Sequence, residues 1–499
     1  MIVLSINGRK LSLREDTTLR VEWVSPFFSG NGIPGVISYP IWVSLSGENS
    51  EILGYPQRPA NTKRVNQRIK GATLSIGSSF QYTGVIIITN GNDRAVEVTF
   101  LGETANFNDV SEKSIKSFSY GGTHTILPAT IAGVKAHMLA ASLGTADTFN
   151  WVWAPMIFGP FDIVNMFDAN AGVFDDSTFT SISPYPYLTY VIRSIFEESG
   201  YTVGGSFLQN EEIKSISIFT VLGENYASFA VSPNISISSL LPDVTVGDFL
   251  NDLVDTFNIA IFFEPGTKNV LFEPFDTMYN NPDYLDWTVI CAPGRYQNYS
   301  FDEGEAGYKF IQNEDESDLQ APGFNLEFTT GVSPYKEVST DIVPTAVSSY
   351  TVPGFGYDWL TPEVQPDNSL PNWFDNFSPA VRLFFYRGYQ AASAPGSSYP
   401  LITPFDKKFG GVDITGAKSS LMWEGNNGLF NRFWKNFIKV KDFGLKKDFP
   451  CQPSEANLKE FSFFRKIRIG NIEHCPAKLT FTSTTTKIKQ ALLETYVAT

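Results

Sequence analysis

The sequence contains very little histidine. Among 499 residues there are only three histidines, His124, His137 and His474. Histidine titrates nearest to neutral pH, and it is the commonest general base and a leading metal ligand. Three scattered copies therefore argue against a catalytic triad and against a histidine-based metal site.

Cysteine is equally scarce. Cys291, Cys451 and Cys475 do not have the spacing of a metal-binding motif, and an odd number of cysteines cannot all pair in intramolecular disulfides. We expect buried or incidental thiols. His474 and Cys475 are adjacent, so in a strand their side chains would point to opposite faces and could not readily act as base and nucleophile.

The common catalytic motifs are also missing. There is no Gly-x-Ser-x-Gly elbow, no phosphate-binding loop, no dinucleotide-binding glycine pattern and no His-Glu-x-x-His. We therefore predict no catalytic residue, no metal site and no cofactor, and expect that the chain is not an enzyme. The acidic run Glu314–Asp318 lacks the glycine and the alternation of a calcium loop, which favours a solvated acidic surface over a calcium site.

Long apolar runs are absent as well. The N-terminus has no basic segment followed by an apolar stretch, and no uninterrupted apolar stretch reaches about twenty residues. The sequence therefore predicts neither a secretory signal nor stable membrane insertion, and a protein that folds in a cytoplasm fits best.

Apolar and aromatic residues are abundant. Hydrophobic residues make up 42% and charged residues 18%, and there are 42 Phe, 21 Tyr and 9 Trp. This balance excludes intrinsic disorder, and aromatic side chains favour strands, buried sheet faces and subunit contacts. The length of 499 residues suggests about three domains.

The net charge of −15 is unevenly distributed. Residues 405–490 contain 16 Lys and Arg against 8 Asp and Glu, a local charge of +8, so the rest of the chain carries −23. An acidic body disfavours tight binding to nucleic acid, because such binding needs cations that neutralise phosphate. The asymmetry indicates different surfaces for different partners.

The first part of the chain has the pattern of a small antiparallel β domain. Asn7-Gly8 separates two strand-like runs, and Asn-Gly supplies the positive φ angles of a two-residue hairpin turn. A second hairpin signal is Asn90-Gly91-Asn92-Asp93, which separates the strand-like runs 82–89 and 95–101. We therefore predict a compact barrel or sandwich at residues 1–120.

Helical spacing appears further along the chain. We expect helices within 126–143, within 187–198 and after Gly428. The clearest unit is 245–275, where a helix that Thr245 can cap carries one apolar stripe and is followed directly by a hairpin. We expect this stripe to pack on its own hairpin.

These patterns predict a β-rich α+β protein of several domains. The expected parts are an N-terminal β-barrel at 1–120, an α+β domain with the helix-hairpin module at 121–290, a loop-rich β region at 291–410, and a C-terminal helix with barrel strands at 411–499.

The helix-hairpin unit, from Thr245 through the second strand to Thr288, resembles modules of the baseplate hub proteins of tailed bacteriophages. These belong with the late control protein D family, which has relatives in type VI secretion spikes. Further segments resemble the variant found in phages of Bacteroidota-type hosts. They are Ser38-Tyr-Pro-Ile41 with Gly54-Tyr-Pro56, Leu421-Met-Trp-Glu-Gly425 running on from Gly428 to Trp434, and Phe464-Arg-Lys-Ile-Arg-Ile-Gly470.

The resemblance implies a structural virion protein assembled in the host cytoplasm. It implies a homotrimer in which each chain contributes two small tail-tube-type β-barrels to a ring that joins the tail tube to the spike or tip proteins. Phage DNA would pass through this ring without specific binding. An acidic channel wall would keep DNA mobile, so we assign the acidic run around Asp315 to the channel as a hypothesis.

Two other functions remain open from the sequence. The first is a carbohydrate-binding receptor protein of the tail tip, which requires solvent-facing aromatic residues such as Trp151, Trp153, Trp359 and Trp373. The structural function predicts instead that most of these are buried. The second is a glycoside or peptidoglycan hydrolase, since paired carboxylates can cleave glycosides, although 52 Asp and Glu supply such pairs by chance and no lysozyme-like insertion is evident.

Overall fold

The fold is described from a computed structural model of the chain. The structure describes residues 2–14, 17–29, 37–58, 68–77, 80–102, 104–158, 163–176, 181–220, 224–264, 267–291, 298–300, 307–313, 326–351, 358–364, 380–392, 396–407, 413–484 and 488–498. The chain divides into two compact units. Unit 1 consists of Met1–Val110, Asn258–Gly304 and Lys435–Thr499, and unit 2 consists of Ser111–Phe257 and Glu305–Trp434.

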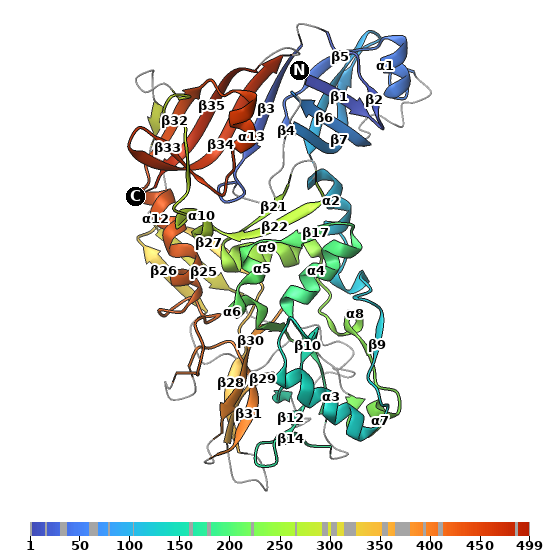
Figure 1. Cartoon of the computed structure of the whole chain (residues 1–499), viewed down its shortest axis with the longest axis vertical. Coiled ribbons are helices and arrows are strands. Elements are labelled where there is room, and N and C mark those ends of the chain that lie inside the picture. The colour runs from blue at the N-terminus through green and yellow to red at the C-terminus, as the bar shows by residue number, and fades with distance from the viewer. Residues whose placement is uncertain are drawn as a thin grey trace. The chain divides into compact units, whose positions relative to one another are not determined.

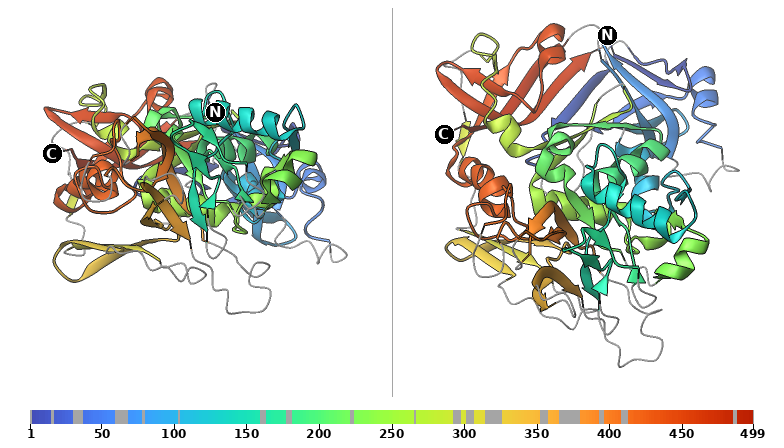
Figure 2. Two further views of the ribbon diagram at one scale, coloured as in Figure 1. Left: turned by 90° about the horizontal axis from the view of Figure 1, so that it is seen from below. Right: turned by 60° about the horizontal axis from the view of Figure 1, so that its bottom comes forward.

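Unit 1 is built on one extended sheet to which both ends of the chain contribute. Its strands follow the order β2-β1-β6-β7-β8-β4-β3-β34-β35-β32-β24. The link is β3 (Thr18–Val24), which pairs with β4 (Ile37–Ser38) on one side and with β34 (Ile472–Thr484) on the other. The blue N-terminal strands and the red C-terminal strands therefore form one sheet (Figures 1 and 2).

The remaining strands of this sheet are β1 (Ile2–Ile6), β2 (Arg9–Lys10), β5 (Ile41–Ser44), β6 (Arg68–Ile76), β7 (Phe80–Gly91), β8 (Ala95–Gly102), β23 (Tyr284–Asp286), β24 (Asn298–Ser300), β32 (Lys446–Cys451), β33 (Lys466–Ile469) and β35 (Ile488–Val497). The hairpin β21 (Ile259–Phe263) and β22 (Asn269–Pro274) also belongs to unit 1, as do the helices α1 (Gly47–Ile52), α2 (Thr104–Ser111, which ends at the boundary), α10 (Phe275–Tyr279), α12 (Lys435–Phe443) and α13 (Glu455–Glu460).

Both hairpins expected near the N-terminus are confirmed. Strands β1 and β2 pair around Asn7 and Gly8, whose φ angles are 49° and 80°. Strands β7 and β8 pair around the second turn, where the Asn92 side chain accepts hydrogen bonds from the backbone N–H groups of Arg94 and Ala95, both at 2.9 Å. In each case the turn residues supply the backbone conformation that joins the strands.

Aromatic rings lie within the core of unit 1, which is otherwise mostly aliphatic. Trp23 on β3 lies edge-on to Phe481 on β34, with ring centroids 5.0 Å apart, and also contacts Tyr82 and Phe461 at 6.0 and 5.9 Å. Because β3 and β34 come from opposite ends of the sequence, this core joins the two ends of the chain.

Two of the three cysteines are not incidental thiols, which corrects the expectation from their spacing. Cys291 and Cys451 form a disulfide in the core of unit 1, with Cα atoms 4.3 Å apart and 160 residues between them in sequence. Cys475 remains a buried free thiol. The pairing was not visible in the sequence because only the fold brings such distant cysteines together.

Unit 2 contains several smaller sheets and three longer helices, α3 (Ile131–Leu143), α4 (Leu188–Glu198) and α9 (Val246–Phe257). The largest sheet has the order β19-β15-β12-β11-β29-β28, and two three-stranded sheets have the orders β18-β30-β31 and β26-β25-β27. Their strands are β11 (Met156–Phe158), β12 (Ile163–Val164), β15 (Ser181–Ile182), β18 (Ile216–Ile218), β19 (Glu224–Asn225), β25 (Gly307–Gln312), β26 (Glu327–Gly331), β27 (Tyr335–Thr340), β28 (Ala346–Thr351), β29 (Asp358–Val364), β30 (Leu383–Ala391) and β31 (Ser398–Thr403).

Shorter elements complete unit 2. They are β9 (Thr123–Thr125), β10 (Trp151–Val152), β13 (Phe167–Asp168), β14 (Val173–Phe174), β16 (Tyr185–Pro186), β17 (Thr202–Gly204), β20 (Asn234–Ser236), the 3₁₀ helix η2 (Ile115–Ser117), α5 (Ser206–Gln209), α6 (Glu211–Lys214), α7 (Tyr226–Val231), α8 (Ile237–Leu240) and the π-helical turn η4 (Phe430–Trp434).

The predicted helices are confirmed with shifted ends. Helix α3 begins at Ile131 and not near 126, because Pro128 precedes it and the Thr130 side chain caps it by accepting a hydrogen bond from Gly133 N. Helix α4 buries its apolar positions as its spacing predicts. The helix after Gly428 starts as the π turn η4 and continues as α12.

Helix α9 confirms the clearest sequence pattern. Thr245 Oγ1 accepts from Asp248 N at 3.1 Å and donates to Asp248 Oδ2 at 2.6 Å, and the stripe from Val246 to Phe257 is buried. The helix belongs to unit 2 and the following hairpin to unit 1, so packing of the stripe on that hairpin stays a prediction. Within unit 2, α9 packs against β27, which the sequence pattern did not suggest.

The prediction of a β-rich α+β protein in several parts is confirmed. Among the described residues, no helix combines the length and the apolar character needed to cross a membrane.

Candidate functional site

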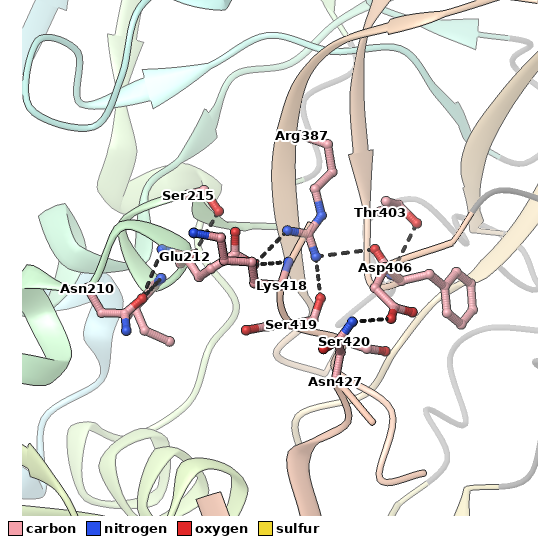
Figure 3. Close-up of polar contacts among 12 residues, drawn as sticks. Asn210, Glu212, Ser215, Arg387, Thr403, Asp406, Lys418, Ser419, Ser420 and Asn427 are labelled. Carbon is pink, nitrogen blue, oxygen red and sulfur yellow. Dashed lines mark hydrogen bonds and ion pairs between the residues drawn. The ribbon is translucent and has the colours of Figure 1, made fainter. Parts of the chain in front are cut away.

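A buried arginine, Arg387, joins several segments of unit 2 (Figure 3). It lies on β30 directly after the apolar run from Leu383 to Tyr386, and its side chain is only 3% exposed. A guanidinium in such a place must be paired, because an unpaired buried charge is very costly. The ring of Phe385 lies beneath it, with Cζ of Arg387 4.0 Å from the ring centroid.

Glu212 supplies the opposite charge. The Asn210 side chain caps helix α6 by accepting from Glu212 N at 2.9 Å, which fixes the start of this short helix. Glu212 Oε2 then accepts from Arg387 Nη1 at 2.9 Å and from the backbone N–H of Lys418 at 3.1 Å. One carboxylate oxygen thus ties α6 to β30 and to the segment around Lys418.

The second terminal nitrogen of the guanidinium binds backbone carbonyls. Arg387 Nη2 donates to Phe405 O at 3.2 Å and also to Ser419 O. Beside these contacts, Asn427 Nδ2 donates to Asp406 Oδ2 at 2.8 Å (Figure 3). We call the contacts of Arg387 with Glu212, Phe405 and Ser419 the Arg387 joint.

The Arg387 joint has the chemistry of a structural element. Burial lowers the pKa of the Arg387 guanidinium and the Glu212 carboxylate opposes this, and arginine is in any case a cation at physiological pH. Removal of one partner of a buried ion pair is strongly destabilising, because it leaves an uncompensated buried charge. Neither residue was predicted from the sequence, although a lone arginine in an apolar strand was a usable signal.

A second polar seam lies between helix α9 and strand β27. Asp341 N donates to Asp252 Oδ1 at 3.0 Å, and the hydroxyls of Thr256 and Thr340 are 2.9 Å apart. Burial raises the pKa of Asp252 to about 7, with the nearby acidic groups adding to the effect, and burial raises the pKa of Asp255 to about 6 against the opposing charge of Lys336. The seam therefore titrates near neutral pH.

The histidines do not converge on one site. His124 and His137 both lie against Trp151, with ring centroids 5.1 and 5.9 Å away, whereas His474 lies in unit 1 and its Nδ1 is 3.1 Å from Thr495 Oγ1. Burial lowers the pKa of His474 to about 4, and burial raises the pKa of the adjacent Cys475 thiol to about 12. At neutral pH this pair provides neither a thiolate nor an imidazolium.

The tryptophans proposed for sugar binding do not form a solvent-facing site where the structure describes them. Trp151 and Trp153 are buried. The side chains of Trp359 and Trp373 and the acidic run Glu314–Asp318 lie outside the described residues. In the described ranges, no three His, Cys, Asp or Glu side chains are grouped so that they could hold a metal ion.

Comparisons with known proteins give only remote likenesses. No family model matches the chain, and no curated protein matches it. Among solved structures, the 43 kDa tail protein of prophage MuSo2 from Shewanella oneidensis is similar over 100% of this chain and 98% of its own, at 9% identity and a TM-score of 0.37.

A tail protein from Neisseria meningitidis is similar over 99% of this chain and 95% of its own, with 9% identity and a TM-score of 0.36. The prophage tail protein gp18 from Listeria monocytogenes is similar over 99% and 94%, with 6% identity and a TM-score of 0.36. Likenesses this loose establish neither the fold nor the function of the chain.

Proposed function

We propose that the chain is a structural subunit of a phage tail, a hub protein whose copies form a ring between the tail tube and the spike or tip. The observation that carries the proposal is the sheet of unit 1, in which β3 and β34 join strands from both ends of the chain. The resemblance implies two tube-type β parts in each subunit, and a sheet that takes strands from both ends of the chain is compatible with them. The helix-hairpin segment adds the resemblance to hub proteins.

The distribution of charge between the units supports passage of DNA. Unit 1 contains 24 Lys and Arg against 22 Asp and Glu, a formal charge of +2, whereas unit 2 contains 13 against 30, a formal charge of −17. An acidic wall repels the phosphate backbone and prevents adsorption. We therefore assign to unit 2 the surface that faces passing DNA.

The assembly state tests this proposal. We expect native mass spectrometry of the purified chain to give a homotrimer and electron microscopy of the same sample to give rings. A monomer at all concentrations would contradict the ring. Reversal of the charges around Asp315 in the assembled virion should slow DNA ejection, and unchanged ejection kinetics would exclude that run from the channel wall.

One observation favours the carbohydrate-binding alternative. Trp42 on strand β5 is 47% exposed, and Tyr39, two residues before that strand, is 41% exposed. Cζ of Arg20 lies 4.4 Å from the centroid of the Tyr39 ring. Exposed aromatic rings can stack on sugars, so glycan-array binding by the chain that is lost in Trp42→Ala would support a receptor function in place of the hub.

A further inference from the structure

Three Asn-Gly pairs lie in the described part of the chain, and they begin at Asn7, Asn90 and Asn427. In such a pair the backbone nitrogen of the glycine can attack the side-chain carbonyl carbon of the asparagine, because glycine has no Cβ to hinder the approach. A fourth pair, Asn31-Gly32, lies outside the described residues. Whether a pair reacts in the folded chain depends on what holds the nitrogen and the carboxamide.

The glycine nitrogen of the Asn90 pair points away from the partner strand β8. Asn92 N donates to Ala95 O at 2.8 Å, and Gly91 is paired with Val96. Hydrogen-bonded and non-hydrogen-bonded pairs alternate in an antiparallel ladder, so Gly91 belongs to a non-hydrogen-bonded pair. Its N–H donates instead to the Asn90 side chain, with Gly91 N and Asn90 Oδ1 2.8 Å apart.

The Asn90 carboxamide therefore lies over the next peptide nitrogen. A C=O bond is about 1.2 Å long, so Asn90 Cγ is at most about 4 Å from Gly91 N, near the separation of reacting atoms before attack. Both residues are exposed, and in the described ranges the carboxamide makes no second hydrogen bond. A register shift between Ile88 and Asn90 also disrupts the ladder at this end of β7.

The Asn7 pair is held in place. Asn7 Oδ1 occupies the space that a Cβ on Gly71 would need, and Asn7 N donates to Gly71 O at 2.9 Å. The tight turn between β1 and β2 fixes the backbone at Asn7 and Gly8. A bond between Gly8 N and Asn7 Cγ would need rotations that the turn and this packing oppose.

The Asn427 pair is held at both reacting groups. The leaving nitrogen, Asn427 Nδ2, donates to Asp406 Oδ2 at 2.8 Å. The attacking nitrogen, Gly428 N, donates to Gly425 O at 3.1 Å, and Gly428 is buried. Reaction at this pair must therefore break two hydrogen bonds.

We propose that Asn90 is a site of non-enzymatic deamidation in the folded chain. Gly91 N forms a bond with Asn90 Cγ while the Cγ–Nδ2 bond breaks, and the proton from Gly91 N leaves with Nδ2 as ammonia. The product is a cyclic succinimide. Water then opens the ring at either carbonyl, so residue 90 becomes aspartate or isoaspartate. Hydroxide promotes the first step by removing the amide proton, so conversion should become faster as the pH rises.

The product places a new charge at one end of the unit 1 sheet. Asn90 is paired with Glu97, and like charges directly opposite each other in a ladder are destabilising. Isoaspartate also lengthens the backbone, which disturbs the turn where Asn92 Oδ1 accepts from the N–H groups of Arg94 and Ala95. Strand β5 pairs with β8 beside this turn, so both strands should lose protection against hydrogen exchange. This inference does not depend on the proposed ring.

Peptide mass spectrometry of the full chain, aged at pH 8, tests the site. Cleavage after Lys and Arg places Asn7, Asn90 and Asn427 in three separate peptides, and fragmentation separates Asn90 from Asn92. In the native chain we expect conversion at Asn90 to be at least about tenfold faster than at Asn427, where two hydrogen bonds must break, and faster than at Asn7. In the chain denatured in urea, all three pairs should convert at similar rates.

The matched variant is Asn90→Gln, which keeps a carboxamide but cannot form the five-membered ring. It should remove conversion from its peptide and leave Asn7 and Asn427 unchanged. The inference is overturned if the native chain converts Asn7 or Asn427 as fast as Asn90, or if only the denatured chain converts Asn90.

Hydrogen exchange tests the consequence of the modification. Asn90→Asp should lower protection in β5 and β8 by about 2-fold to 5-fold, and its combination with Glu97→Gln should restore most of it. Asn90→Gln should behave as the wild type. Equal protection in Asn90→Asp and Asn90→Gln would refute the effect of the added charge.

Discussion

Replacement of Asp252 by asparagine should remove the loss of stability that the ionised carboxylate causes at high pH in the seam between α9 and β27. The carboxyl group is buried and accepts a hydrogen bond from Asp341 N at 3.0 Å. The acidic groups that act on it are Asp341 itself, Asp255 and Asp248, whereas the charge of Lys336 acts on Asp255. Asparagine keeps the accepting oxygen and has no charge.

The sign follows from the raised pKa. In the folded chain the pKa of Asp252 is about 7, above the unfolded value, so the folded state takes up the proton first as the pH falls. Stability should therefore rise as the pH falls through 7, and the stabilisation should be complete near the unfolded pKa. From pH 8 to about 5.5 the linkage gives about 2 kcal/mol, and about 1 kcal/mol after allowance for solvent screening.

Hydrogen–deuterium exchange of α9 peptides measures this effect locally, so two-state unfolding of the whole chain is not required. After correction for intrinsic exchange rates, protection in α9 should rise between about 5-fold and 30-fold from pH 8 to about 5.5. Asp252→Asn should be more protected than the wild type at pH 8 and should lose most of the pH dependence. Asp283→Asn, at an exposed position of unit 1, is the control. A wild-type pH dependence that persists in Asp252→Asn would refute the reasoning.

The Arg387 joint and the cysteines give two further predictions. Arg387→Leu should destabilise unit 2 by about 3–5 kcal/mol in urea unfolding, because Glu212 stays buried without its partner, and Arg387→Leu combined with Glu212→Leu should recover part of this loss. Without a reductant, iodoacetamide at pH 8 should label no cysteine in the native chain and only Cys475 after denaturation, whereas full reduction should expose three thiols. Labelling of Cys291 and Cys451 without reduction would contradict the disulfide.

The local parts of the fold could be predicted from the sequence because short-range chemistry determines them. The Asn7-Gly8 turn and the Thr245 cap are examples, since each depends on residues within a few positions of one another. The pairing of β3 with β34 could not be predicted, because the two strands are more than 400 residues apart and many apolar strands could have taken either place.

The same distinction applies to the polar joints. Arg387 and Glu212 are 175 residues apart, and the disulfide spans 160 residues, so neither pairing leaves a local pattern. A sequence can indicate that a buried arginine needs a carboxylate, as the apolar run before Arg387 does. It cannot indicate which of 52 acidic residues is the partner.

Different interactions stabilise the two units, so the units should respond differently to pH. Unit 1 is held by a mostly aliphatic core that includes several aromatic rings and by a buried disulfide, neither of which titrates near neutral pH. Unit 2 combines apolar packing with the Arg387 joint and the seam at Asp252, and this seam changes its charge near pH 7. Acidification should therefore tighten unit 2 at α9, whereas β34 of unit 1 should lose protection, because burial holds the pKa of His474 at about 4 and the unfolded state takes up the proton first. A rise in protection in both units would mean that the seam is not its source.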